Sequence, residues 1–202
     1  MIGWMVLQGA RLTTTNLDED IGFFQLLGLA LAEMEENRAL LVPCCGPHLS
    51  LVRGAGTELT AVFSGMGPRV DLEGNPLFYE APAADLTTKG QAQPPKPLYP
   101  VVDLHSSIEW YTRQLKLSEV FLDAPTQWAE LQDERGGRII LSFTPDLDTP
   151  AMLVLPVADA AAEVERLREF EVSPAQARQL SWGRIAAYRS PGGLAVLLQE
   201  LH

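Results

Sequence analysis

The chain has 202 residues, of which 47% are hydrophobic, and its 26 acidic and 15 basic side chains give a formal net charge of −11. The length and apolar content suit a folded core and exclude an intrinsically disordered protein. The acidic excess repels phosphate backbones and anionic lipid, so we expect no nucleic-acid partner and no membrane partner. No segment approaches the roughly 20 apolar residues of a membrane span or the pattern of a secretory signal, and we expect a cytoplasmic protein.

The first predicted unit opens with a strand and a helix. The β-branched run Leu12–Thr15 is typical of a strand, and Asn16 can cap the helix that follows. The acidic residues just after Asn16 favour a helix N-terminus, because they meet the positive end of the helix dipole. Gly28 suits the end of the helix. The apolar stripe of this helix consists of Ile21, Phe23, Phe24 and Leu27.

Short apolar runs separated by turn residues follow the helix and predict strands. They are Leu29–Ala32, Ala39–Val42, His48–Val52, Glu58–Phe63 and Leu77–Glu80. No helix fits between the fourth and the fifth run. The segment therefore predicts one strand-helix-strand-strand-strand (βαβββ) unit, followed by a shortened unit that lacks its helix.

The two cysteines of the chain, Cys44 and Cys45, are adjacent. Neighbours in sequence rarely meet disulfide geometry, and a single pair cannot staple a fold of this size. We therefore expect both to be reduced thiols in a reducing compartment.

A proline-rich connector divides the chain. Residues 81–100 contain five prolines and lose apolar periodicity. The predicted organisation is a shortened domain over residues 1–82, a linker over 83–97 and a complete domain over 98–202. The shortened domain leaves strand edges that the second domain or a second copy of the chain could cover, so a homodimer is one expectation.

The second segment repeats the first one. Asp103 takes the capping position of Asn16, and the same helical stripe follows it. This stripe consists of Ile108, Trp110, Tyr111 and Leu115. Strands are predicted at Glu119–Leu122, Trp128–Leu131 and Arg138–Phe143. The segment thus begins with another βαβββ unit.

A last unit is predicted in the same way. The strand Met152–Pro156 leads to Asp159 as a cap and to an amphipathic helix over Ala160–Phe170. Two strands, Ile185–Tyr188 and Leu194–Leu198, close the unit around a proline-glycine turn. The whole chain therefore predicts an α+β fold of tandem βαβββ units.

Several motifs recur in a fixed order. They are Val102-Asp103-(x)3-Ser107-Ile108-Glu109-Trp110-Tyr111, then Val157-Ala158-Asp159, and the closing turns Asp71-Leu72-Glu73-Gly74-Asn75 and Ser190-Pro191-Gly192-Gly193. Their order and spacing resemble the vicinal-oxygen-chelate (VOC) superfamily, which contains glyoxalases, bleomycin-resistance proteins and extradiol dioxygenases. The resemblance implies paired units that curl around a cleft lined by strand residues.

In metal-dependent members, the resemblance implies His or Gln ligands at the start of first strands and a Glu in a closing strand. The matching positions of this chain are Lys96, Gly9, Met152, Leu197 and Phe78. None of these is the expected ligand, so we expect neither a metal nor another cofactor. The alternative is a divalent metal at a displaced site.

Candidate ligand-binding residues lie on strands or at strand ends, where alternate side chains turn toward the cleft. They are Trp128, Tyr99, Trp182, Tyr188, His48, Glu80 and Glu200. The aromatic members are suited to stack on an apolar or aromatic ligand, with core packing as the alternative. For His48, Glu80 and Glu200 the alternative is a solvated position at a strand end. The sequence identifies no catalytic residue, because it contains no nucleophile elbow and no phosphate-binding loop.

Three functions stay open. The missing metal ligands favour a metal-free protein that binds a small apolar or aromatic molecule. The second is an enzyme of the lyase or dioxygenase type, either metal-independent or with a displaced metal bound by His48, Glu80 or Glu200. The third is an interaction protein, because Asn16–Phe24 followed by Leu29–Val42 is similar to the start of the CppA family. That family carries two such domains and is described as a complement-degrading proteinase.

Overall fold

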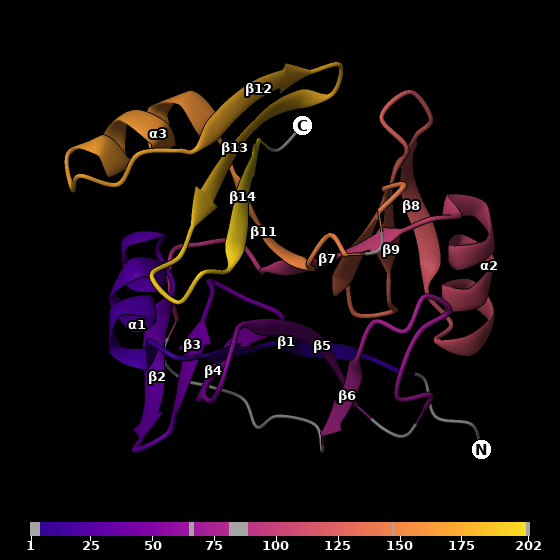
Figure 1. Cartoon of the computed structure of the whole chain (residues 1–202), viewed down its shortest axis with the longest axis horizontal. Coiled ribbons are helices and arrows are strands. Elements are labelled where there is room, and N and C mark those ends of the chain that lie inside the picture. Colours follow the sequence, from indigo (N-terminus) through magenta and orange to yellow (C-terminus); the bar gives the residue numbers. More distant parts are fainter. Residues whose placement is uncertain (1–4, 65–66, 81–88, 147, 201–202) are drawn as a thin grey trace.

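The computed structural model describes residues 5–64, 67–80, 89–146 and 148–200, which form two β-sheets and three helices (Figure 1). The elements of the first half are β1 (Leu7–Thr14), α1 (Leu17–Leu26), β2 (Ala30–Glu35), β3 (Arg38–Val42), β4 (His48–Arg53), β5 (Glu58–Ser64) and β6 (Leu77–Glu80). Those of the second half are β7 (Lys96–Val101), α2 (Leu104–Gln114), β8 (Ser118–Asp123), β9 (Trp128–Gln132), β10 (Arg138–Phe143), β11 (Met152–Val157), α3 (Ala160–Arg168), β12 (Gln176–Leu180), β13 (Gly183–Arg189) and β14 (Ala195–Glu200).

Each complete unit closes by pairing its first strand in parallel with its last strand. These pairs are β1 with β4, β7 with β10, and β11 with β14. β1 also pairs antiparallel with β5, which gives a six-stranded sheet of order β2-β3-β4-β1-β5-β6. β7 pairs antiparallel with β11, which gives an eight-stranded sheet of order β12-β13-β14-β11-β7-β10-β9-β8. The predicted α+β fold of tandem units is confirmed.

The second unit is short. Within the described residues it consists of β5 and β6, which match the two strands that the sequence predicted at Glu58–Phe63 and Leu77–Glu80. They pair in parallel as the first and last strands of the other units do. The turn Asp71–Asn75 precedes β6, and the Asp71 carboxylate accepts hydrogen bonds from the backbone N of Glu73 and Asn75 at 3.0 and 2.7 Å.

Two strands of the second half differ from the prediction. The five residues of β12 are polar or mostly exposed, as suits an edge strand, and they carry no alternating pattern that would have predicted it. β7 begins at Lys96, inside the range 83–97 that was predicted to be a linker. Its prolines lie where the strand is paired on one side only, because Pro97 is opposite β11 and Pro100 is opposite β10.

The helices begin where the sequence places their caps. The Asp103 carboxylate accepts a hydrogen bond from Ser106 N at 3.0 Å, and Asp159 accepts one from Ala161 N at 2.8 Å. Asn16 occupies the capping position of α1 without a side-chain cap hydrogen bond. None of the helices in the described part of the chain is long and apolar enough to cross a membrane.

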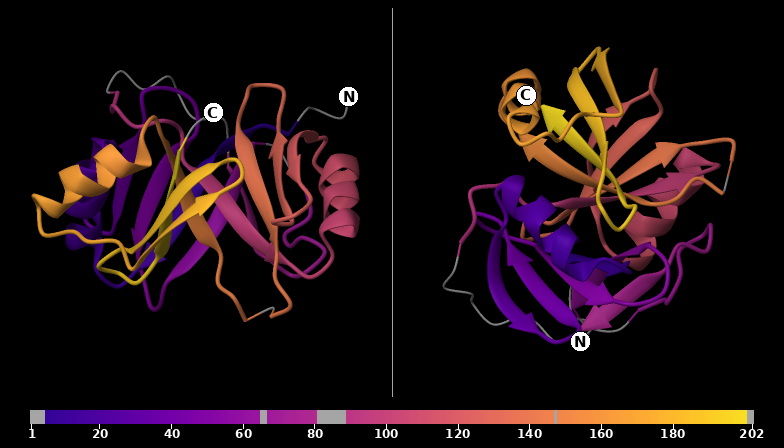
Figure 2. Two further views of the ribbon diagram at one scale, coloured as in Figure 1. Left: turned by 90° about the horizontal axis from the view of Figure 1, so that it is seen from above. Right: turned by 60° about the vertical axis from the view of Figure 1, so that its left-hand side comes forward.

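The sheets pack against each other through the faces that carry the helices. One core joins the first and fourth units and includes Leu51 and Leu198, while another joins the second and third units and includes Phe63 and Tyr111. α1 and α3 accordingly lie together at one end of the molecule and α2 lies at the other end (Figures 1 and 2). The second face of each sheet points away from these two cores.

Candidate ligand-binding site

A cluster of charged and polar side chains lies on the face of the eight-stranded sheet that points away from the two cores; we name this face the site face. The charged cluster consists of Lys96, Glu130, Arg138 and Gln199. Strand alternation explains its position, because the neighbours of these residues along each strand, such as Leu131, belong to the opposite, core-facing side.

An ion pair lies at the centre of the charged cluster. Lys96 Nζ donates to Glu130 Oε2 at 2.9 Å and to Gln199 Oε1 at 3.1 Å. Gln199 Nε2 in turn donates to Glu130 Oε1 at 2.9 Å, so both carboxylate oxygens are hydrogen-bonded. Arg138 adds a second cation at 3.3 Å from Glu130 Oε2, and its Nε donates to Gln132 at 2.8 Å. The side chains of Lys96 and Glu130 are only 8% and 5% exposed.

Burial and neighbouring charge act in opposite directions on this ion pair. Burial alone would raise the pKa of Glu130, but Lys96, Gln199 and Arg138 together hold that pKa below its ordinary value. Burial lowers the pKa of Lys96, and the Glu130 carboxylate offsets part of this change. Glu130 is therefore an ionised carboxylate near neutral pH.

Aromatic rings form the wall beside the charged cluster. The ring centroids of Trp128 and Trp182 are 5.2 Å apart, and those of Phe121 and Trp182 are 6.1 Å apart. Trp182 Nε1 donates to Thr126 Oγ1 at 3.4 Å. The buried Trp128 Nε1 finds no hydrogen-bond acceptor among the residues that the structure describes. The wall thus combines apolar ring surface with one buried donor.

Two cavities meet at the charged cluster. The first has a volume of about 200 Å³, and its lining includes Lys96, Glu130, Arg138, Phe121 and Trp182. The second has a volume of about 250 Å³, and it shares Lys96 and Arg138 with the first. Both cations therefore line half-open cavities, and aromatic rings bound the first of these cavities.

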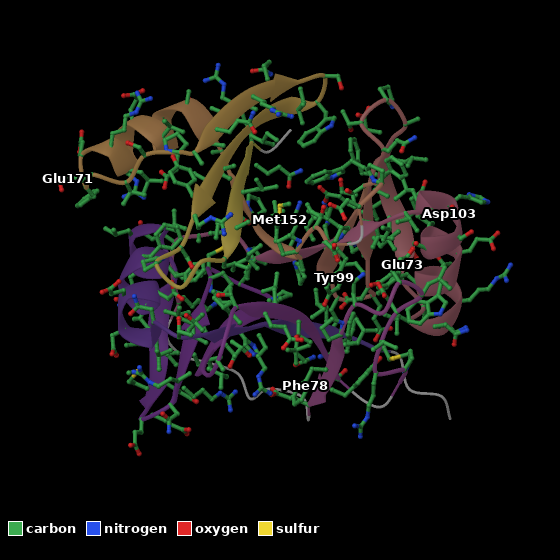
Figure 3. The ribbon with its side chains drawn as sticks, in the orientation of Figure 1. Glu73, Phe78, Tyr99, Asp103, Met152 and Glu171 are labelled. Atoms are coloured by element: carbon green, nitrogen blue, oxygen red, sulfur yellow. The ribbon has the colours of Figure 1, made fainter. Side chains whose placement is uncertain are left out.

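Three of the positions at which the superfamily resemblance implies metal ligands, Lys96, Met152 and Leu197, lie close together on the eight-stranded sheet, but their side chains do not fit a divalent ion. Lys96 is opposite Val154 in the sheet, and Val154 is opposite Leu197. Met152 lies two residues before Val154 on the same strand, near the middle of the molecule (Figure 3). A divalent ion needs several oxygen, nitrogen or thiolate donors, whereas this set offers an ammonium group, a thioether and an alkyl group.

The remaining metal positions and two further candidates lie on the six-stranded sheet. Gly9 is in β1 and Phe78 in β6, where the Arg11 guanidinium lies 4.8 Å from the Phe78 ring centroid. His48 is opposite Gly9 in the sheet, and Glu80 lies two residues after Phe78 on β6. Burial lowers the pKa of His48, and the Glu80 carboxylate partly offsets this change. In the part of the chain that the structure describes, no three His, Cys, Asp or Glu side chains are grouped to hold a metal.

The other candidates of the sequence do not come together at the charged cluster. Trp128 and Trp182 lie beside it, but Tyr99 and Tyr188 belong to the two cores behind the sheet. Tyr99 is fully buried where the sheets meet (Figure 3), and its hydroxyl donates to Pro76 O at 2.9 Å. Glu200 ends β14 at the rim of the first cavity.

Sequence reasoning missed the polar part of the charged cluster. Lys96 was recognised only as a metal position without a metal ligand, and Glu130, Arg138 and Gln199 were not singled out. A usable signal was present, since Glu130 interrupts an apolar strand run at a position that alternates with Leu131. A charge at such a place predicts either a polar face or a buried partner.

No protein-family model and no curated protein match the sequence. Solved structures do match it. A catechol 2,3-dioxygenase aligns with a TM-score of 0.70 at 15% identity, over 96% of this chain and 87% of that chain. The Mn(II)-bound glyoxalase from Novosphingobium aromaticivorans aligns with a TM-score of 0.69 at 11% identity, over 96% of this chain and 81% of that chain.

A third match is homoprotocatechuate 2,3-dioxygenase from Brevibacterium fuscum in complex with 3,4-dihydroxyphenylacetate. It has a TM-score of 0.67 and 12% identity, over 98% of this chain and 81% of that chain. At such identities the likeness concerns the fold and not the chemistry. Together with the strand order of both sheets, these matches show that the chain has the fold of the vicinal-oxygen-chelate superfamily.

Proposed function

We propose that this protein is a metal-independent VOC-fold protein that binds a small aromatic molecule in the first cavity of the site face. The observation that carries the proposal is the Lys96 ammonium, which stands at the position of a metal ligand and neutralises Glu130 at 2.9 Å. A metal cation bound at the same place would have to compete with the Lys96 ammonium for the Glu130 carboxylate. The site therefore favours a ligand without a metal.

The aromatic wall supports an aromatic ligand. Trp182 lies against both Phe121 and Trp128, and Phe121 and Trp182 line the cavity. A flat ring placed there would gain edge or offset stacking in addition to the burial of its apolar surface. A volume of about 200 Å³ is below the range of drug-sized sites, roughly 300–1,000 Å³, and suits a single substituted ring.

The test uses the purified full chain with EDTA present throughout. Phenol, indole and benzamide are titrated, and binding is followed by tryptophan fluorescence and by the shift in melting temperature. We expect saturable binding that is weakened about tenfold or more in Trp182→Leu, since a buried ring contact is lost. Trp110→Leu, on α2 and away from the cavity, is the matched control.

Two results would overturn the proposal. One is the absence of saturable binding for every aromatic probe. The other is stoichiometric iron, manganese, zinc or nickel in the purified protein, with binding lost after chelation. The second result would favour the displaced-metal enzyme that the sequence left open, for which His48, Glu80 and Glu200 were the candidate ligands.

The remaining expectations from the sequence stay predictions. They are the likeness to the CppA family and to bleomycin-resistance proteins, the cytoplasmic location, the homodimer and the lack of a nucleic-acid partner. No described contact favours a proteinase, because the structure brings no nucleophile, base and orienting group together on the site face. Among the open functions, ligand binding is the one that the charged cluster and the aromatic wall support.

A further inference from the structure

We propose that the ligand of the first cavity carries a carboxylate, and that the Arg138 guanidinium holds this group beside Lys96. This inference rests on the proposed function and names the chemical class of its ligand, a small aromatic acid. It follows from the charges that face the cavity, from the donors around it and from its size.

The charged cluster holds more positive than negative charge. Lys96 and Arg138 both contact the same oxygen of Glu130, at 2.9 and 3.3 Å, and Gln199 takes the other oxygen at 2.9 Å. One carboxylate therefore faces two cations. The Arg138 side chain is 41% exposed and lines both cavities, so its planar fork is in reach of a second carboxylate.

Two further acidic residues lie near the charged cluster. Glu200 follows Gln199 along β14 and lines the first cavity at its rim. The Asp123 carboxylate closes the turn after β8, where it accepts hydrogen bonds from the backbone N of Thr126 at 3.2 Å and from the Thr126 hydroxyl. Neither contacts Arg138 in a described ion pair.

The rings of the wall suit a flat ligand beside these cations. Phe121 and Trp182 line the first cavity, and Trp128 is not among its lining residues. Trp128 belongs to the same strand as Glu130 and stacks on Trp182. A ligand that offers oxygen acceptors on a flat ring satisfies the cations and suits the rings at once, whereas an amine or a metal cation would add to the positive charge.

The experiment compares benzoate with benzamide, which share a shape and differ in charge. Isothermal titration with the full chain in EDTA should show that benzoate binds about tenfold or more tightly than benzamide, because hydrogen bonds between oppositely charged groups are stronger than those to a neutral amide. Arg138→Gln should remove that preference, so that benzoate and benzamide bind with equal affinity. Arg135→Gln, in the exposed turn before β10, is the matched control and should keep the preference.

The outcomes separate this inference from the proposed function. If both probes bind equally in the wild-type chain, the aromatic site stands and the carboxylate does not. If neither probe binds, the proposed function falls. If Arg138→Gln fails to fold, Arg138→Lys takes its place. That variant should keep part of the benzoate preference, and added salt should weaken benzoate binding but not benzamide binding. A preference unaffected by both changes would overturn the role of Arg138.

Discussion

The carboxylate of Asp20 in α1 accepts a hydrogen bond from the backbone N of Gly192, in the closing turn of the last unit, at 2.8 Å. Its other oxygen accepts one from Thr14 Oγ1 at 2.6 Å. A Cβ at Gly192 would collide with Asp20 and Thr14, so only glycine allows this approach. In the repeat alignment Asp20 corresponds to Ser107, whose hydroxyl donates to Glu73 in the other closing turn. Each closing turn thus packs on the helix of the opposite half.

We expect Asp20→Ala to lower the free energy of unfolding by about 1–3 kcal/mol, because it leaves the buried N–H of Gly192 without its acceptor. Urea unfolding followed by circular dichroism measures the change. Asp18→Ala is the matched control from the same helical turn, since Asp18 is exposed and its described ion pair with Arg53 lies on the surface. The control should stay within about 0.5 kcal/mol of wild type. Equal losses in both variants would show that the contact with Gly192 adds nothing.

Tyr99 and Tyr188 offer a second matched pair. The Tyr99 hydroxyl accepts from Ala61 N at 2.6 Å and donates to Pro76 O at 2.9 Å, and it so joins the two sheets. Tyr99→Phe should cost about 1–3 kcal/mol because both backbone groups lose their partner. The buried Tyr188 hydroxyl has no partner among the described residues, so Tyr188→Phe should be neutral or stabilising. Thermal unfolding of both variants gives the comparison, and a larger loss in Tyr188→Phe would contradict it.

The Lys96–Glu130 ion pair predicts strong coupling between two substitutions. Lys96→Met and Glu130→Leu should each destabilise the fold, by about 3 kcal/mol, because each leaves a buried charge without its main partner. The double variant should lose clearly less than the sum of the two. A double-mutant cycle in urea measures this difference. The exposed pair Glu109–Arg113 is the control and should couple by no more than about 0.5 kcal/mol.

Much of the fold was predictable because it repeats. Strand, cap and helix recur at Asn16 and Asp103, and the same hydrophobic pattern then fixes which side of each strand is buried. The pattern failed where apolar and polar residues do not alternate along a strand, as in β12, and where prolines break the usual signal, as in β7. Pairing on one side only is what lets Pro97 and Pro100 stay in β7, and this is a tertiary property that a local pattern does not contain.

The candidate site was less predictable than the fold, because it depends on which strands are neighbours. Lys96, Glu130 and Gln199 are far apart in the chain and meet only through the order β14-β11-β7-β10-β9. Tyr99 and Trp128 both lie on predicted strands, yet alternation places Tyr99 in the core and Trp128 on the site face. A shift of one residue in the predicted register moves a side chain to the opposite face of the sheet. Sequence patterns alone therefore could not tell an aromatic residue of the core from one on the site face.

His48 predicts how stability depends on pH. Burial is the main reason that its pKa in the folded protein lies below the ordinary 6.5; Arg38 lowers it further, and the carboxylates of Glu80 and Glu33 partly oppose this. The folded state therefore prefers the neutral imidazole, and the unfolded chain takes up a proton first as the pH falls. Stability from this residue is complete above the unfolded pKa and is lost as the pH drops toward the folded pKa. Urea unfolding at about pH 7.5 and about pH 5.5 should show the loss.

The control uses the exposed histidine of α2. His105→Gln should keep the loss of stability between the two pH values, because His105 is exposed on the surface of α2 and is not part of the buried site of His48. His48→Gln removes the titrating group from its buried position and should flatten the dependence over the same interval. If instead His105→Gln flattens it and His48→Gln does not, the imidazole of His48 is as well solvated in the folded protein as in the unfolded chain.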